Sequence, residues 1–106
     1  MRFAITDLSD EQKWSVQGQL VGEWAAELLS TWKKTHHAED PRRTIVDLIE
    51  VTSIDRNGEA VLAEMMSQGA EFISGDVYTE HLLRKLRREL KRSLEKEKQD
   101  GGGTKS

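Results

Sequence analysis

The polar residues whose types and spacing could do chemistry are concentrated between a β-branched stretch and a helical apolar repeat. Asp55 stands immediately before that repeat, where the N-cap of a helix belongs. Its carboxylate can accept a hydrogen bond from a backbone N–H of the next turn, and its charge complements the positive end of the helix dipole. The sequence therefore predicts a helix cap at Asp55 and leaves open an added contact with a binding partner.

Arg56 follows the predicted cap and places a cation where the helix dipole disfavours one, at a cost of about 0.3–1 kcal/mol. An ion pair with Asp55 or Glu59 would offset that cost, and a solvated surface arginine is the plain alternative. Because functional residues often break local rules, the functional interpretation is a contact between Arg56 and an acidic or phosphorylated group on a partner. The predicted partner-binding surface is completed by Asn57, Gly58 and Glu59.

Other side chains of chemical interest do not form a recognisable catalytic pattern. Thr52 and Ser53 offer hydroxyls in the same predicted loop and are candidate alternative phosphorylation sites, although most loop hydroxyls only form turns and caps. His36, His37 and His81 are joined by no cysteine and no spaced carboxylate cluster, so no metal site is expected. No Walker loop, dinucleotide fingerprint or nucleophile elbow is present. We therefore expect that the protein binds no cofactor and is not an enzyme.

The elements that must position these residues are predicted from hydrophobic periodicity. Alternation indicates two antiparallel strands near the start of the chain, and a nearly continuous apolar run indicates a central strand covered on both faces. Helical periodicity indicates three helices, the last one long. The predicted order is ββαβαβα with parallel central strands, in an α/β fold with a mixed sheet of about four strands. The better-defined spans are the central strand at 44–49, the second helix at 57–68 and the last strand at 70–74.

Two further expectations concern side chains within these elements. Trp14, Trp24 and Trp32 occur at strand or helix core spacing, which is more typical of a hydrophobic core than of a ligand site. Asp47 lies at the end of the predicted central strand, so we expect it near the loop that carries Asp55, bonded to loop backbone.

Charge and composition limit the class of protein. The 106-residue chain has a net charge of −3, but residues 1–83 carry 7 basic and 15 acidic side chains, whereas residues 84–106 carry 9 basic and 4 acidic ones. An acidic body argues against a nucleic-acid-binding core. The absence of cysteine suits a reducing cytoplasm. No signal-peptide run or membrane-length apolar stretch is present, so we expect a cytoplasmic protein without a transmembrane segment.

The predicted organisation is one domain over 1–86, a basic helical extension over 87–98 and a disordered tail over 99–106. Leucines recur every four residues along the last helix, and the distal ones have basic neighbours. Several interpretations of that stripe stay open. They are continued packing on the sheet followed by a frayed end, docking to a partner helix, self-association, and contact with an anionic membrane surface.

Two stretches resemble the STAS domain family of bacterial anti-sigma factor antagonists, over residues 2 to about 86. The more specific one begins with Val46-Asp47-Leu48 and continues through Val51-Thr52-Ser53-Ile54-Asp55 to Gly58. It is similar to the family's central strand and the Asp that precedes its second helix. The other, Gln17-Gly18-Gln19-Leu20, is similar to the Gly-x-Leu of the family's early strand.

The resemblance implies a regulatory protein-interaction module in signal transduction and transcription regulation. In the family, the Asp that Asp55 matches is followed by a hydroxyl residue. A partner kinase, which is also the anti-sigma factor, phosphorylates that hydroxyl. Here Arg56 occupies that position and Asn57 follows it, so neither residue can serve as the usual phosphoacceptor. The resemblance leaves two alternatives: an accessory subunit of a lipid-transport ATPase complex and a nucleotide-sensing STAS domain.

Overall fold

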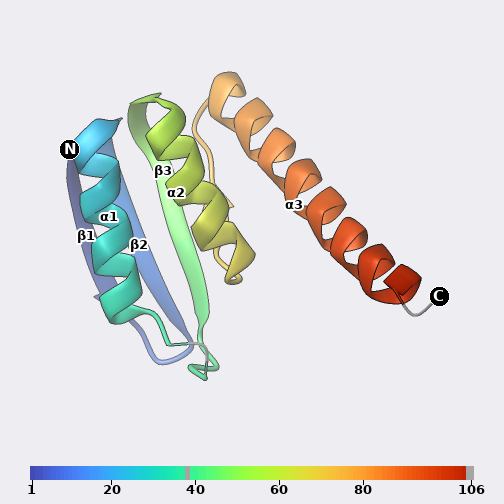
Figure 1. Cartoon of the computed structure of the whole chain (residues 1–106). Coiled ribbons are helices and arrows are strands. Elements are labelled where there is room, and N and C mark those ends of the chain that lie inside the picture. Colours follow the sequence, from blue (N-terminus) through green and yellow to red (C-terminus); the bar gives the residue numbers. More distant parts are fainter. Residues whose placement is uncertain (38, 105–106) are drawn as a thin grey trace.

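The computed structural model describes the backbone of residues 1–37 and 39–104, with side chains as far as Glu95. The chain forms an α/β fold in the predicted order ββαβαβα (Figure 1). The strands are β1 (Arg2–Asp7), β2 (Glu11–Leu20), β3 (Arg43–Ile54) and β4 (Glu71–Ile73), and the helices are α1 (Gly22–Thr35), α2 (Arg56–Ser67) and α3 (Val77–Thr104).

The four strands form one mixed sheet in the order β1-β2-β3-β4. β1 pairs antiparallel with β2 through a tight hairpin, in which Leu8 N donates to Glu11 O at 2.8 Å. β2, β3 and β4 are mutually parallel, as predicted for strands joined by helical crossovers. Each of these three parallel strands leads into a helix, so all three helices begin at the same edge of the sheet (Figure 1).

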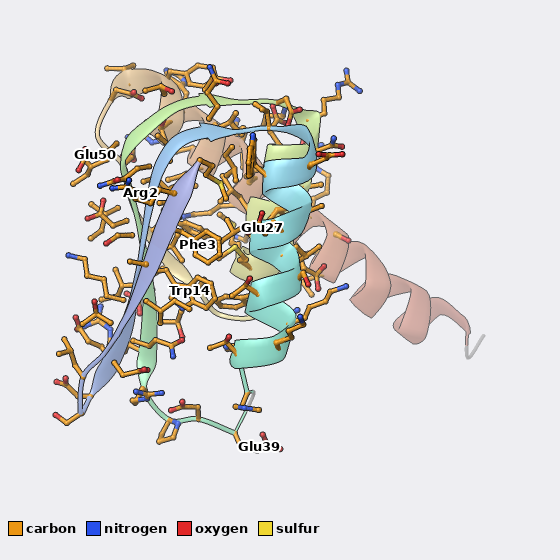
Figure 2. All side chains as sticks on the ribbon, turned by 90° about the vertical axis from the view of Figure 1, so that its left-hand side faces the viewer. Arg2, Phe3, Trp14, Glu27, Glu39 and Glu50 are labelled. Atoms are coloured by element: carbon orange, nitrogen blue, oxygen red, sulfur yellow. The ribbon has the colours of Figure 1, made fainter. Side chains whose placement is uncertain are left out.

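The sheet is covered by helices on one face, and the prediction that the central strand is covered on both faces is wrong. α1 and α2 lie on the same side (Figure 1). Figure 2 shows Phe3 and Trp14 pointing toward α1, with Arg2 and Glu50 on the other side of the sheet. Within the described residues no helix covers that other side, and Ile49 of β3 is 53% exposed there. We call this surface the open sheet face.

The sequence predicts a shorter strand than β3, because two irregularities in the β2–β3 ladder break the alternation of buried and exposed side chains. Its buried positions alternate as far as Leu48 and then shift to Val51 and Ile54. At the first irregularity, the Asp47 carboxylate accepts a hydrogen bond from Ile49 N at 2.9 Å. Extra residues at such bulges change which side chains face the core. The strand therefore continues to Ile54 although its period-two pattern breaks after residue 48.

The core is built around two tryptophans between the sheet and α1. The rings of Trp14 and Trp32 lie 5.4 Å apart, and both side chains are fully buried. Their indole nitrogens donate to Gln12 at 2.9 Å and to Gln68 at 3.0 Å, which satisfies the polar atoms that burial would otherwise strand. Trp24, also expected in the core, is 48% exposed because it lies beside the buried stripe of α1 and not on it.

Among the side chains of α3 that the structure describes, those of its first half pack on the body. Leu82, Leu83 and Leu86 are buried, Leu90 is partly buried, and Leu94 is 56% exposed. Figure 1 shows α3 diverging from α2 toward its C-terminal end. None of the helices in the described part of the chain has the length and apolar character needed to cross a membrane.

The end of α3 differs from the sequence expectation. The helix continues through 99–104, where the sequence predicts a tail without regular structure, while residues 105 and 106 lie outside the described residues. Gly101, Gly102 and Gly103 each disfavour a helix by about 1 kcal/mol relative to alanine. Disorder of this tail in solution therefore stays a prediction.

Candidate functional site

Asp55 is the single residue between β3 and α2, and its carboxylate joins the first turns of two helices. Oδ1 accepts a hydrogen bond from Gly58 N at 2.8 Å, which is the predicted N-cap of α2. Oδ2 accepts from Gly22 N, in the first turn of α1, at 2.9 Å. We call this arrangement the Asp55 bridge. It fixes α1 and α2 relative to each other at the edge of the sheet where the helices begin.

These bonds favour the charged form of Asp55. The pKa of its carboxyl lies below the usual value, chiefly because Gly58 N–H donates to it and, to a smaller extent, because Gly22 N–H does. The cap prediction is confirmed. Direct contact between Asp55 and a partner stays a prediction, and both carboxylate oxygens already have backbone donors.

Gly58 is a buried residue in the first turn of α2, at a position with no room for a side chain. A Cβ at this position would overlap the carbonyl oxygen of Leu20 and would lie 2.8 Å from Ile54 Cγ2. The glycine lets α2 approach the end of β2 closely. Its part in the predicted partner surface can therefore only be to position its neighbours or to offer backbone.

Arg56 and Asn57 are the exposed members of the predicted surface. Among the side chains that the structure describes, Arg56 forms no ion pair, so the pairing considered with Asp55 or Glu59 is not formed. Glu59 instead lies 3.5 Å from Lys85 of α3. The guanidinium of Arg56 is thus left without a carboxylate partner beside the positive end of the α2 dipole.

A groove of about 520 Å³ runs between α2 and α3 beside Arg56. Alanines of α2 and a leucine of α3 supply its apolar part, and two cations and two carboxylates supply its polar part. Its lining residues are Arg56, Glu59, Ala60, Ala63, Lys85, Leu86 and Glu89.

The structure does not place the alternative phosphorylation sites in a loop. Thr52 and Ser53 both belong to β3, where Thr52 is exposed and Ser53 is partly buried opposite Gln19. The expectation for Asp47 is also wrong, because β3 continues well beyond it. Its carboxylate bonds to its own strand and lies 3.7 Å from Lys13 Nζ on the open sheet face.

The histidines lie apart, and each has a local environment of its own. The ring of His36 stacks on Trp32 at a centroid distance of 4.3 Å, His37 lies in the exposed connection after α1, and His81 lies on α3. Within the side chains that the structure describes, no three histidine, aspartate or glutamate groups gather in a way that could hold a metal ion.

Sequence reasoning missed several residues around this edge of the sheet. Gly22 was not linked to Asp55, and Lys85 was not linked to Glu59. Exposed apolar side chains also occur in the first turns of α1 and α3, where Trp24, Val77 and Tyr78 are 48%, 75% and 58% exposed. Only the parallel topology, which starts all three helices at one edge, could have indicated this gathering.

Comparisons with known proteins support the fold but identify no family. No protein-family model matches the chain, and no curated protein matches it. Among solved structures, the chain is similar to one titled "Crystal Structure Analysis of Mglu", with a TM-score of 0.55 and 19% sequence identity. The match covers 70% of this chain and only 19% of that chain. At this identity the likeness concerns the α/β fold alone.

Proposed function

We propose that this chain is a non-catalytic regulatory module of the STAS type that works in the cytoplasm and binds a protein partner through the first turn of α2. The observation that carries the proposal is the exposure of Arg56 and Asn57 on a turn that the hydrogen bonds of the Asp55 bridge tie to α1. A rigid surface loses little conformational freedom when it binds, which favours affinity.

The chemistry of the turn supports an acidic or phosphorylated contact on the partner. A guanidinium presents a planar set of donors that matches a carboxylate or a phosphate, and Arg56 has no carboxylate within the described side chains. Exposed Trp24 and Tyr78 lie in helix turns at the same edge of the sheet. Arginine, tyrosine and tryptophan are the residues enriched at the energetic centres of protein interfaces.

Arg56 also changes how such a module would be regulated. A serine or threonine at this position could gain about −1.5 to −2 charges by phosphorylation, whereas Arg56 keeps a fixed positive charge. We propose that binding at the α2 turn is constitutive, or is controlled at another position such as Thr52 or Ser53.

The structure offers no support for the nucleotide-sensing alternative. A phosphate at the start of α2 would use the free backbone N–H groups of its first turn. The Asp55 carboxylate already accepts from Gly58 N in that turn, and its negative charge repels a phosphate.

The test is an affinity capture with quantitative mass spectrometry, followed by titration of the captured protein. Wild type is compared with Arg56→Ser, with Arg56→Glu, and with Lys34→Glu at the far end of α1 as a control of equal charge change. We expect wild type, Arg56→Ser and Lys34→Glu to bind one defined partner, and Arg56→Glu to bind it at least about tenfold more weakly. Equal binding by all four proteins would show that the α2 turn is not the interface.

A further inference from the structure

α3 carries a row of cations on the side that faces away from its buried leucines. Arg84, Arg87, Arg88 and Lys91 follow the i, i+3, i+4, i+7 spacing that places side chains on one helix face. We call this set the basic face. With His81 it lines a shallow surface depression of about 460 Å³.

Most of this charge is unpaired. Arg84 lies 3.6 Å from Glu80, but Arg87, Arg88 and Lys91 form no ion pair with any side chain that the structure describes. Like charges four residues apart destabilise a helix, and the basic face has two such pairs, Arg84 with Arg88 and Arg87 with Lys91. An anionic partner would relieve that repulsion.

An apolar edge lies directly beside the basic face. Leu90 is only partly covered by the body and Leu94 is 56% exposed. Leu94 lies three residues from Lys91 and seven from Arg87, so it shares their flank of the helix. A partner that reaches the cations from this side also meets these leucines.

We propose that the basic face and its leucine edge dock an acidic amphipathic helix of a protein partner. A second copy of α3 does not fit, because pairing through the leucine edge would bring Arg87 and Lys91 close to the same cations of the other copy. Carboxylates suit the guanidinium groups, and apolar side chains of an amphipathic helix suit Leu90 and Leu94.

Extended polyanions fit this surface less well. Residues 1–83 carry 15 acidic side chains against 7 basic ones, so the body repels a nucleic acid or an anionic membrane that extends past α3. Leu82, Leu83 and Leu86 are packed on the body and cannot enter a bilayer. A phosphate backbone would leave Leu94 without an apolar contact. A short acidic helix can occupy the distal part of α3 alone.

The proposal is independent of the function assigned to the α2 turn, because no residue of the basic face belongs to that turn. Its probe is a fluorescent synthetic helix of three heptads, with leucine at a and d and glutamate at e and g, titrated with the full chain. A matched peptide carries glutamine in place of glutamate. Anionic phosphatidylglycerol vesicles and a short DNA duplex are titrated in parallel.

Two variants separate charge at α3 from net charge, and a third tests the leucine edge. Arg87→Glu, Arg88→Glu and Lys91→Glu are combined in one chain. The control combines Arg2→Glu, Lys33→Glu and Lys34→Glu, which are exposed and lie outside α3. The third variant is Leu94→Ala. Circular dichroism and thermal unfolding check that each variant folds.

We expect the wild-type chain and the control to bind the glutamate peptide, and the α3 triple variant to bind it at least about tenfold more weakly. Leu94→Ala should weaken binding several-fold, and the glutamine peptide should bind poorly. The proposal is overturned if the glutamate peptide binds no better than the glutamine peptide, or if neither α3 variant weakens binding. Tighter binding to vesicles or to DNA than to the peptide overturns it as well.

Discussion

Gly58 gives the sharpest test of how the candidate site is built, because local propensity and packing predict opposite effects there. Replacing a glycine inside a helix by alanine normally stabilises a protein by about 1 kcal/mol. In this structure a Cβ at Gly58 would overlap the carbonyl oxygen of Leu20 and lie 2.8 Å from Ile54 Cγ2. We therefore predict that Gly58→Ala destabilises the fold.

The magnitude follows from what has to move. Ordinary contacts to a Cβ begin at 3.4 Å, so Ile54 Cγ2 alone must retreat by about 0.6 Å. The overlap with Leu20 involves backbone, which can be relieved only by shifting α2 away from the end of β2. Overpacking of this kind costs about 1–3 kcal/mol, against the expected gain of about 1 kcal/mol from propensity. Because the overlap involves backbone, the upper part of that range applies, about 2–3 kcal/mol, and Gly58→Ala should be less stable than wild type by about 1–2 kcal/mol.

The assay is equilibrium unfolding in urea, followed by the fluorescence of the buried tryptophans. Gly58→Val, which adds more bulk, should be less stable than Gly58→Ala. Ala60→Gly, at an exposed position of the same helix, calibrates propensity alone and should cost about 1 kcal/mol. A Gly58→Ala protein as stable as wild type, or more stable, would refute the close approach of α2 to β2.

Two further predictions concern the Asp55 bridge and the core. The pKa of Asp55 is lowered in the folded state by Gly58 N–H and then Gly22 N–H, so the bridge stabilises the fold above about pH 4 and its contribution is lost as the pH falls through the folded-state pKa. Wild type should therefore lose more melting temperature than Asp55→Asn between pH 7 and pH 3, and equal losses would contradict the bridge. Trp32→Ala should cost about 3–5 kcal/mol and Trp24→Ala less than about 1 kcal/mol in urea unfolding, and similar costs would place Trp24 in the core.

The order of elements could be predicted because each helix and strand follows a strong local pattern. The switch from period two to helical periodicity after Leu20 marks the start of α1. Gly69, with φ of +98°, follows the end of α2, where a glycine commonly stops a helix. Asp76, which directly precedes α3, caps that helix by accepting from Thr79 N at 2.7 Å. These features depend on residues that are neighbours in the chain.

The features that could not be predicted depend on register and on long-range placement. A nearly continuous apolar run at 44–49 suggests a strand buried on both sides. In the structure Ile45 and Ile49 lie on the open sheet face, and the buried positions of this stretch are Thr44, Val46 and Leu48. The two bulges also conceal the strand's continuation through Thr52 and Ser53. The sequence does not show whether a helix covers an isoleucine on a strand, because the residue type is the same in both cases.

The same limit applies to the candidate site. Asp55 could be identified as a cap because a cap bonds to the backbone of the next turn, here to Gly58 N, three residues along the chain. Its second bond is to Gly22 N, which is 33 residues away in the sequence, and no local rule predicts it. The exposure of Arg56 was predicted from chemistry, but the pairing of Glu59 with Lys85 depends on how α3 packs against α2. Local sequence patterns identify the candidate residues, whereas tertiary packing determines which of their side chains are already paired within the chain.

The distribution of charge around the α2–α3 groove argues for two separate contacts rather than one. Arg56 lies at the groove without a carboxylate partner among the described side chains, and Arg88 lies on the basic face, also unpaired. Between these cations, Glu59 is paired with Lys85, and Glu89 adds another carboxylate to the groove. An acidic ligand that spanned both cations would have to pass these carboxylates, at a cost in like-charge repulsion. We therefore expect the two proposed binding surfaces, the α2 turn and the basic face, to contact different segments or different partners.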